Sequence, residues 1–322
     1  MDKKTKYAIG IDIGGTNIPS SLINSDGKIL KTVNKKTPSA SKPEVLIESI
    51  SDSINEIKEH LKKEFPTSKI SGIGLGVPGA LDIEKGEIIT SPNLKNWKNV
   101  PIVKMLSKIS KMPVCMDNDA NLAAIGEHWI GAGLGFSNIV MLTLGTGVGG
   151  GIIINNNIYR GSHGTAGEIG HITIVEKGEI CACGNYGCLE AYASANGTVK
   201  RALKELGKTS IKSSLKDLKK EELSAQTIYL HAKNGDRFSK KILIDSGRYL
   251  GIGIATLANI FDPDAIIIGG GFSKAEEFLI PAAIMEANKR SFKTIMDKLV
   301  IKRAKLGNNA GMIGAAKLAL FN

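Results

Sequence analysis

The chain has 322 residues, of which 42% are hydrophobic and 23% charged, and this composition excludes a wholly disordered protein. Its 37 glycines exceed the average share of about 7%, which indicates many tight turns or a backbone that approaches a ligand closely. The net charge of +11 fits an anionic substrate, a lysine-rich surface or nucleic acid, but residues 200–220 contain no aromatic side chain for base stacking, so we expect no nucleic-acid partner.

The first half of the chain alternates predicted strands and helices. We expect a strand at residues 7–14 and a returning strand at residues 18–23. Pro19 lacks an N–H donor, so either it lies at a sheet edge or this boundary is misplaced. Apolar residues recur every three or four positions in residues 43–65, which predicts a helix. The remaining elements are strands at residues 69–77 and 113–117 and a helix at residues 120–129.

The second half continues the alternation. Two strands are expected at residues 138–144 and 150–154 around a glycine-rich turn, followed by loops to about residue 190 and helices to residue 261. The last expected elements are a strand at 265–268, a helix at 276–290, a strand at 299–303 and a helix at 310–320. Strands that alternate with helices indicate an α/β protein.

One internal repeat indicates the architecture. Residues 9–24 and 140–155 both have the pattern strand, glycine turn with Thr, apolar return strand. The identities are few, Gly14 with Gly145 and Asn24 with Asn155, so a chance match is the alternative. A true repeat predicts two related halves with a ligand in the cleft between them.

The two glycine turns favour phosphate binding. Residues 74–79 and 145–150 match GxGxxG, but no helix follows either match, which argues against a dinucleotide fold, and there is no P-loop motif. A turn whose N–H groups and Thr hydroxyl surround a phosphate is the remaining functional reading, and a plain hairpin turn is the alternative. Two such turns, with Asp12 on the first, favour phosphate.

Four residues form a predicted metal site. His171, Cys181, Cys183 and Cys188 supply one imidazole and three thiolates, the ligand set of a tetrahedral structural Zn²⁺ with no open position. Such an ion in the loop 171–188 holds Glu168 and Glu190 near one place; solvated loop acids are the alternative. The fourth cysteine, Cys115, is expected in the core.

Location follows from what the sequence lacks. No stretch reaches the ~18 uninterrupted apolar residues of a membrane span. The N-terminal residues have no signal-peptide pattern, and four cysteines do not make a disulfide scaffold. We expect a cytoplasmic protein without a membrane partner.

Several motifs together resemble those of the ROK family of repressors and sugar kinases, within the actin-like ATPase superfold. They are DIGGTN (residues 12–17), LGTGVGGG (144–151), GEIGH (167–171), CACGNYGCLE (181–190) and IIIGGGFS (266–273). The resemblance implies a two-domain α/β actin-like (ribonuclease H-like) fold with an interdomain cleft and a zinc-binding loop. It implies a small domain of residues 1–117 plus 305–322 and a large domain of residues 118–304.

The resemblance also implies site roles. The ATP phosphates and adenosine would contact Asp12, Gly14, Gly15, Thr16, Asn17, Gly145, Thr146, Gly147, Gly269, Gly270 and Gly271. The sugar would contact Gly79, Asn93, Asn118, Asp119, Glu168, His171 and Glu190. Asp119 would be the catalytic base and Asp12 would orient Mg²⁺, through water, whereas Asp117 has no such role. Asp and Asn after a strand are also common helix caps, which is the alternative for residues 117–119.

The implied activity is ATP-dependent phosphorylation of a hexose at its 6-hydroxyl. Residues 76–82, 91–97 and 167–171 look most like those of bacterial glucokinases, so glucose is the expected substrate. The alternatives are an N-acetylmannosamine, N-acetylglucosamine, mannose or fructose kinase, polyphosphate as donor, or a sugar-responsive repressor without its DNA-binding domain. The resemblance implies a homodimer.

Overall fold

The computed structural model describes residues 5–38, 42–91, 94 and 97–321. The chain divides into two compact units: unit 1 comprises Met1–Phe136, Gly151–Ala166 and Lys305–Asn322, and unit 2 comprises Ser137–Gly150 and Gly167–Ala304. This grouping by compactness places residues 118–136 with the N-terminal residues. The boundary expected after residue 117 concerns functional domains and stays a prediction.

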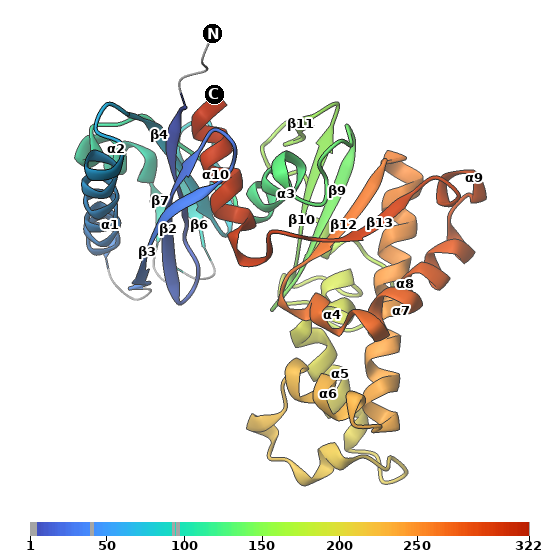
Figure 1. The fold of residues 1–322 in the computed structure, drawn as a ribbon. Coiled ribbons are helices and arrows are strands. Elements are labelled where there is room, and N and C mark those ends of the chain that lie inside the picture. The colour runs from blue at the N-terminus through green and yellow to red at the C-terminus, as the bar shows by residue number, and fades with distance from the viewer. Residues whose placement is uncertain (1–4, 39–41, 92–93, 95–96, 322) are drawn as a thin grey trace. The chain divides into compact units, whose positions relative to one another are not determined.

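Unit 1 contains a five-stranded sheet of order β3-β2-β1-β4-β8 (Figure 1). Its strands are β1 (Tyr7–Asp12), β2 (Asn17–Asn24), β3 (Ile29–Lys36), β4 (Ile70–Val77) and β8 (Val114–Asn118). β1, β2 and β3 pair antiparallel, whereas β4 is parallel to both β1 and β8. A smaller sheet is formed by β5 (Ala80–Asp82), β6 (Glu87–Thr90) and β7 (Lys98–Val100). Strands β3, β5, β6 and β7 were not expected from the sequence.

The expectation that Pro19 marks a sheet edge or a misplaced boundary is wrong. β2 lies between β1 and β3 and includes Pro19, which is opposite Asn34. The proline is tolerated because the ladder between β1 and β2 ends at Ser20, so Pro19 is paired only on its β3 side.

Helices cover both faces of the first sheet. One core joins β1 and β4 to α1 (Pro43–Glu64) and α2 (Ile102–Ser110), and another joins Ala8 and Ile23 to α10 (Ala310–Phe321). A side chain at Gly10 or Gly74 would lie within 2 Å of the α10 backbone, which explains why these strand positions are glycine. α3 (Asp119–Ile130) also packs on α10.

The second sheet has the order β11-β10-β9-β12-β13. Its strands are β9 (Ile139–Leu144), β10 (Val148–Ile154), β11 (Asn157–Ile158), β12 (Ala265–Gly269) and β13 (Val300–Arg303). β12 is parallel to both β9 and β13. The two sheets therefore share one strand order, which supports the repeat and confirms the α/β class.

The helices of unit 2 are α4 (Leu189–Ala193), α5 (Ala195–Leu206), α6 (Ala225–Lys233), α7 (Arg237–Phe261), α8 (Glu276–Arg290) and α9 (Lys293–Met296). Short 3-10 turns are η1 (Ile169–His171), η2 (Ser214–Asp217), η3 (Lys220–Glu222), η4 (Gly271–Ala275) and η5 (Gly307–Asn309), the last in unit 1. α7 packs closely on α8 because Gly247 and Gly251 leave room for the α8 backbone. Among the described residues, no helix combines the length and apolarity that crossing a bilayer requires.

Candidate functional site

The corner between β8 and α3 presents two polar residues. Asn118 is the N-cap of α3, and its Oδ1 accepts a hydrogen bond from the Ala120 N–H at 2.9 Å. Asp119 is the first helical residue, is partly exposed, and accepts from the same N–H at 2.9 Å. Asn118 is therefore a helix cap. The bond from Ala120 to Asp119 uses the Oδ1 atom of this carboxylate.

Asp117 is committed to structure. Its side chain is fully buried, and Oδ2 accepts from Arg160 Nε at 2.9 Å and Nη2 at 2.7 Å. Its Oδ1 accepts from the Asn118 N–H and from Asn121 Nδ2. Both carboxylate oxygens of Asp117 are thus held by a guanidinium and two further donors. The expectation that Asp117 has no catalytic role stays a prediction.

Asp12 ends β1 in unit 1. Burial, with a smaller contribution from the charge of Asp119, raises the pKa of Asp12 to about 7. Gly311 of α10 lies beside its carboxylate, where an added Cβ would be 3.1 Å from Oδ2. Asp12 and Asp119 thus repel each other through space, an arrangement that a divalent cation between or beside them relieves.

The first turn follows Asp12 directly. The Gly14 N–H donates to the Asn17 carbonyl at 3.0 Å, which closes the turn, and Gly15, Thr16 and Asn17 are exposed. Thr37, which directly follows β3, supports the turn: its hydroxyl donates to the Gly14 carbonyl and its N–H to the Thr16 carbonyl.

The second turn lies between β9 and β10 in unit 2. The Gly145 N–H donates to the Gly147 carbonyl at 2.9 Å, and the Gly145 carbonyl accepts from the Ala195 N–H at the start of α5. Glu190 of α4 accepts from the Val148 N–H at 2.9 Å. A Cβ at Gly147 would lie 2.2 Å from Glu190 Oε2, so the carboxylate requires glycine there.

The expected adenosine segment follows β12. A Cβ at Gly270 would lie 2.2 Å from the Leu144 carbonyl oxygen, and one at Gly269 would lie 2.7 Å from Met141 Cε. Nothing lies within 4 Å of a Cβ at Gly271. Packing on β9 thus explains the first two glycines, and Gly271 leaves space for a ligand.

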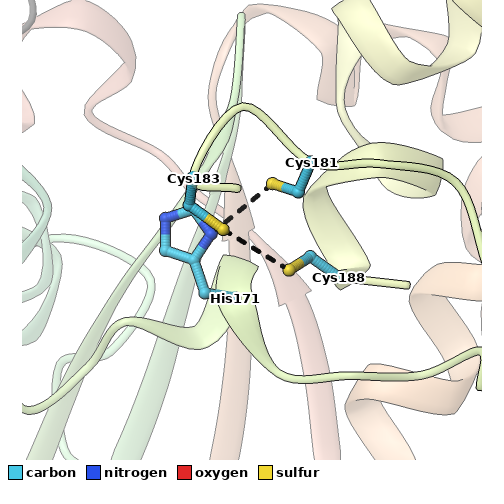
Figure 2. A group of neighbouring side chains, drawn as sticks. All are labelled: His171, Cys181, Cys183 and Cys188. Atoms are coloured by element: carbon cyan, nitrogen blue, oxygen red, sulfur yellow. Dashed lines mark hydrogen bonds between the residues drawn. The ribbon is translucent and has the colours of Figure 1, made fainter. Parts of the chain in front are cut away.

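The predicted metal ligands lie together (Figure 2). The ligand atoms of His171, Cys181, Cys183 and Cys188 are all within 4.8 Å of one another, and the Sγ atoms of Cys183 and Cys188 are 3.7 Å apart. Two thiolates on a tetrahedral Zn²⁺ with Zn–S bonds of about 2.3 Å are separated by roughly 3.8 Å. Burial raises the pKa of Cys188 to about 12, so this thiol stays protonated at neutral pH without a cation. The donor set and its spacing fit Zn²⁺.

The metal cluster adjoins two carboxylates. Nδ1 of His171 faces Cys181 Sγ at 3.7 Å, and its Nε2 lies 3.8 Å from Glu168 Oε2. Glu190 also reaches the cluster, with Oε1 3.6 Å from Cys181 Sγ. The structure therefore brings Glu168, His171 and Glu190 to one loop system. Gly79 lies in unit 1 with a φ of 112°, and Asn93 lies outside the described residues.

Sequence reasoning missed Arg160, Thr37 and Glu127. Fully buried, Glu127 of α3 accepts from the N–H groups of Ala132, Lys305 and Leu306, and it thereby fastens the chain where it returns to unit 1. These residues lie in no recognisable motif, and only a pairing with a distant segment shows their role.

Comparisons with known proteins agree with these features. A model of the ROK family matches residues 8–321. A glucokinase of Halalkalibacterium halodurans is 38% identical over 318 residues, which cover 97% of this chain and 94% of that protein. A crystal structure of a ROK family glucokinase from Streptomyces griseus in complex with glucose and AMPPNP has a TM-score of 0.80 at 33% identity, covering 97% of this chain and 98% of that one. The xylose repressor of Caldicellulosiruptor bescii is 35% identical over 99% of this chain and 79% of its own.

Proposed function

The chain belongs to the ROK family, and from this premise we propose that it is a glucokinase, which transfers the γ-phosphoryl group of ATP to the 6-hydroxyl of glucose. The observation that carries this proposal is similarity to glucokinases along almost the whole chain, including one solved with glucose and the ATP analogue AMPPNP. The polar corner at Asp119 and the carboxylates around the metal cluster supply the groups that such a reaction needs.

In the proposed mechanism Asp119 accepts the proton of the 6-hydroxyl. The hydroxyl oxygen forms a bond to the γ-phosphorus as the bond from this phosphorus to the β–γ bridging oxygen breaks, and ADP leaves. Asn118 binds the neighbouring sugar hydroxyl. Its position as cap of α3, anchored by Asp117 and Arg160, holds both side chains at a fixed corner.

The nucleotide is held by the two turns in this proposal. Gly14, Gly15, Thr16 and Asn17 of unit 1, and Gly145, Thr146 and Gly147 of unit 2, donate to the phosphates, while Gly269, Gly270 and Gly271 border the adenosine. Mg²⁺, when bound to the nucleotide, neutralises charge on the phosphates. Asp12 would orient it, and a carboxylate with a raised pKa beside a second carboxylate fits a cation site.

Sugar recognition is assigned to the loop that the metal stabilises. Glu168 and Glu190 would accept hydrogen bonds from ring hydroxyls and His171 would donate one, with Gly79 and Asn93 as further sugar contacts. The His171 ring has Nδ1 toward the thiols and Nε2 toward Glu168, so coordination through Nδ1 leaves Nε2 as the donor. Zn²⁺ would be structural, because the four protein ligands leave no site for water.

One assay tests the activity and its alternatives. ADP release is measured with glucose, mannose, fructose, N-acetylglucosamine and N-acetylmannosamine, with ATP or polyphosphate as donor. The highest kcat/KM is expected for glucose and ATP, and a higher value for another sugar reassigns the substrate.

A repressor is the alternative of a different class, because xylose repressors match nearly the whole chain. Retention of sugar binding with no turnover of any sugar, together with sequence-specific DNA binding, would favour it. Sedimentation of the pure protein tests the homodimer, which stays a prediction, as does the cytoplasmic location.

A further inference from the structure

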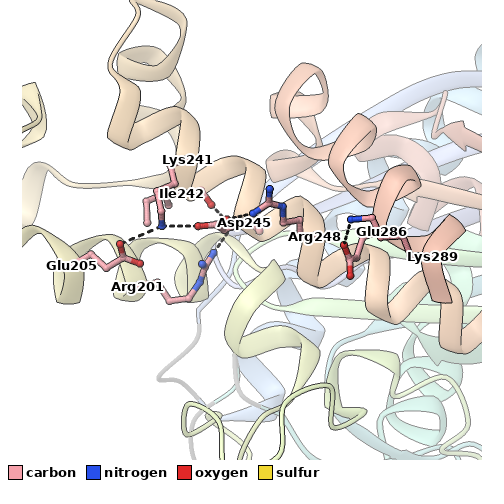
Figure 3. A network of polar contacts seen from close by, with 9 residues as sticks. Arg201, Glu205, Lys241, Ile242, Asp245, Arg248, Glu286 and Lys289 are labelled. Atoms are coloured by element: carbon pink, nitrogen blue, oxygen red, sulfur yellow. Dashed lines mark hydrogen bonds and ion pairs between the residues drawn. The ribbon is translucent and has the colours of Figure 1, made fainter. Parts of the chain in front are cut away.

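A polar cavity lies wholly within unit 2. Its volume is about 520 Å³, and its walls come mainly from α5, α7 and α8, with Tyr192 of α4, Glu179 and Lys208 as further lining residues. Figure 3 shows Lys241 and Arg248 of α7 paired with carboxylates, and Arg201 of the neighbouring α5. No residue of the cavity is among those assigned above to glucose or ATP.

The carboxylates of this cavity already have basic partners. Glu205 pairs with Lys241 at 3.4 Å, and Asp245 pairs with Lys241 at 2.8 Å and Arg248 at 3.2 Å. Glu286 pairs with Arg290 at 2.6 Å. Glu179, the fourth acid, pairs with Lys204. The acids are therefore neutralised by residues that line or border the cavity.

Two lining cations remain without a carboxylate within ion-pair distance in the described part of the chain: Arg201 and Lys208. Arg201 is only 9% exposed. Its Nη2 donates to the Tyr192 carbonyl and to Ser246 Oγ, whereas its Nε is buried without a partner in the described structure. A buried guanidinium with unused donors at a cavity is an anion-binding group.

Tyr249 of α7 lines the cavity beside Arg201. Its ring lies under the Arg201 guanidinium, with the guanidinium carbon 5.2 Å from the ring centroid. The same ring packs against that of Tyr192, with the centroids 4.4 Å apart and the planes tilted by 39°. The ring fixes the guanidinium in place, which lowers the entropy cost of binding a ligand there.

We propose that this cavity binds a small phosphate monoester through Arg201, Lys208 and Tyr249. Two cations without carboxylate partners match the charge of a phosphate dianion, and a guanidinium fork matches its oxygens. Glucose 6-phosphate, the product of the proposed reaction, belongs to this class, and to that extent the inference rests on the proposed function.

The site has a direct connection to the second phosphate turn. Arg201 lies on α5, whose first N–H, that of Ala195, donates to the Gly145 carbonyl. Its Nη2 also holds the end of α4, the helix that carries Glu190. A ligand that binds Arg201 therefore contacts a residue that connects α4 and α5, the two helices that support the second turn. Such a ligand would change the affinity for ATP.

Isothermal titration of glucose 6-phosphate into full-length protein saturated with glucose tests the proposal, because glucose blocks the sugar site. We expect one molecule bound per chain. Lys208→Gln is expected to weaken binding about fivefold, the loss of one exposed charge contact. Arg201→Met is expected to weaken it at least about tenfold, the loss of a charge-assisted hydrogen bond.

Lys212→Gln is the matched control, because this exposed lysine is four positions further along and does not line the cavity. It should bind as wild type, and Lys208→Gln should keep the kcat of the wild type without added phosphate ester. Should Arg201→Met not fold, Lys208→Gln still decides. The proposal would be overturned if glucose 6-phosphate did not bind or bound Lys208→Gln as tightly as wild type. Equal affinity for malate, a dianion without a phosphate group, would also overturn it.

An inorganic phosphate titration separates this proposal from the kinase assignment. Phosphate binding that depends on Arg201 and Lys208 would stand even if no sugar were phosphorylated. Normal glucokinase activity with no such binding would remove this site alone.

Discussion

The two sheets share one strand order but support their turns differently. In unit 1 the acid beside the turn, Asp12, belongs to the strand itself, and Thr37, the residue directly after β3, holds the turn. In unit 2 the acid is Glu190, which comes from α4 and is placed beside the metal cluster. The strand order alone therefore does not supply the carboxylate. One turn obtains it from its own strand and the other from a helix that begins beside the cluster of predicted metal ligands.

The largest effect is expected at the corner of unit 1. Asp119→Asn keeps the shape of the side chain but removes the proton acceptor, so kcat should fall by about 10²–10⁴-fold. Glucose binding, followed by titration in the absence of ATP, should change little. Full turnover by this variant would exclude Asp119 as the base.

Next in size is the anchor of that corner. Arg160→Met leaves Asp117 buried without its cation and should cost about 3–5 kcal/mol of stability, measured by urea unfolding. The double variant with Asp117→Leu should recover part of this loss, since both charges are then absent. Equal stability of Arg160→Met and wild type would show that the pair does not hold the corner.

Unit 2 is tested through its cluster. Cys188→Ser should lose the bound zinc, measured by elemental analysis, and raise the KM for glucose by about 10–100-fold, because the loop no longer positions Glu168 and Glu190. Cys115→Ser is the control, since Cys115 lies on β8 outside the cluster and should keep both zinc and KM. A zinc-free wild type with normal KM would contradict the assigned role.

The smallest effect is expected in the pH dependence of stability, through Asp12 of unit 1. The pKa of Asp12 is about 7 in the folded protein against 3.8 as its ordinary value, so the folded state binds the proton more tightly. Without Mg²⁺, this group therefore lowers stability as pH rises from about 4 through 7. Asp12→Asn should gain Tm relative to wild type from pH 5 to pH 8, by a few degrees at most. A Tm difference between Asp12→Asn and wild type that does not change with pH would refute the raised pKa of Asp12.

Much of this organisation was predictable from the sequence. The α/β class, the family and the four clustered metal ligands were predicted, because periodicity and short-range spacing are local properties. The strand β3 and the small sheet of β5 to β7 were missed, since their short, half-exposed segments have no strong alternation. The prediction that Pro19 lies at a sheet edge was wrong, because the sequence of one strand does not show where its pairing with a neighbouring strand ends.

By itself the sequence determined which chemical groups are available: the glycine turns, the Asn-Asp pair, and one imidazole with three thiols in a short loop. Only the tertiary structure decided how neighbouring carboxylates divide their roles. Asp117 is neutralised by Arg160, 43 positions away, and Glu190 reaches Val148, 42 positions away. Such pairings depend on sheet register and helix packing, which bring distant residues within hydrogen-bond distance.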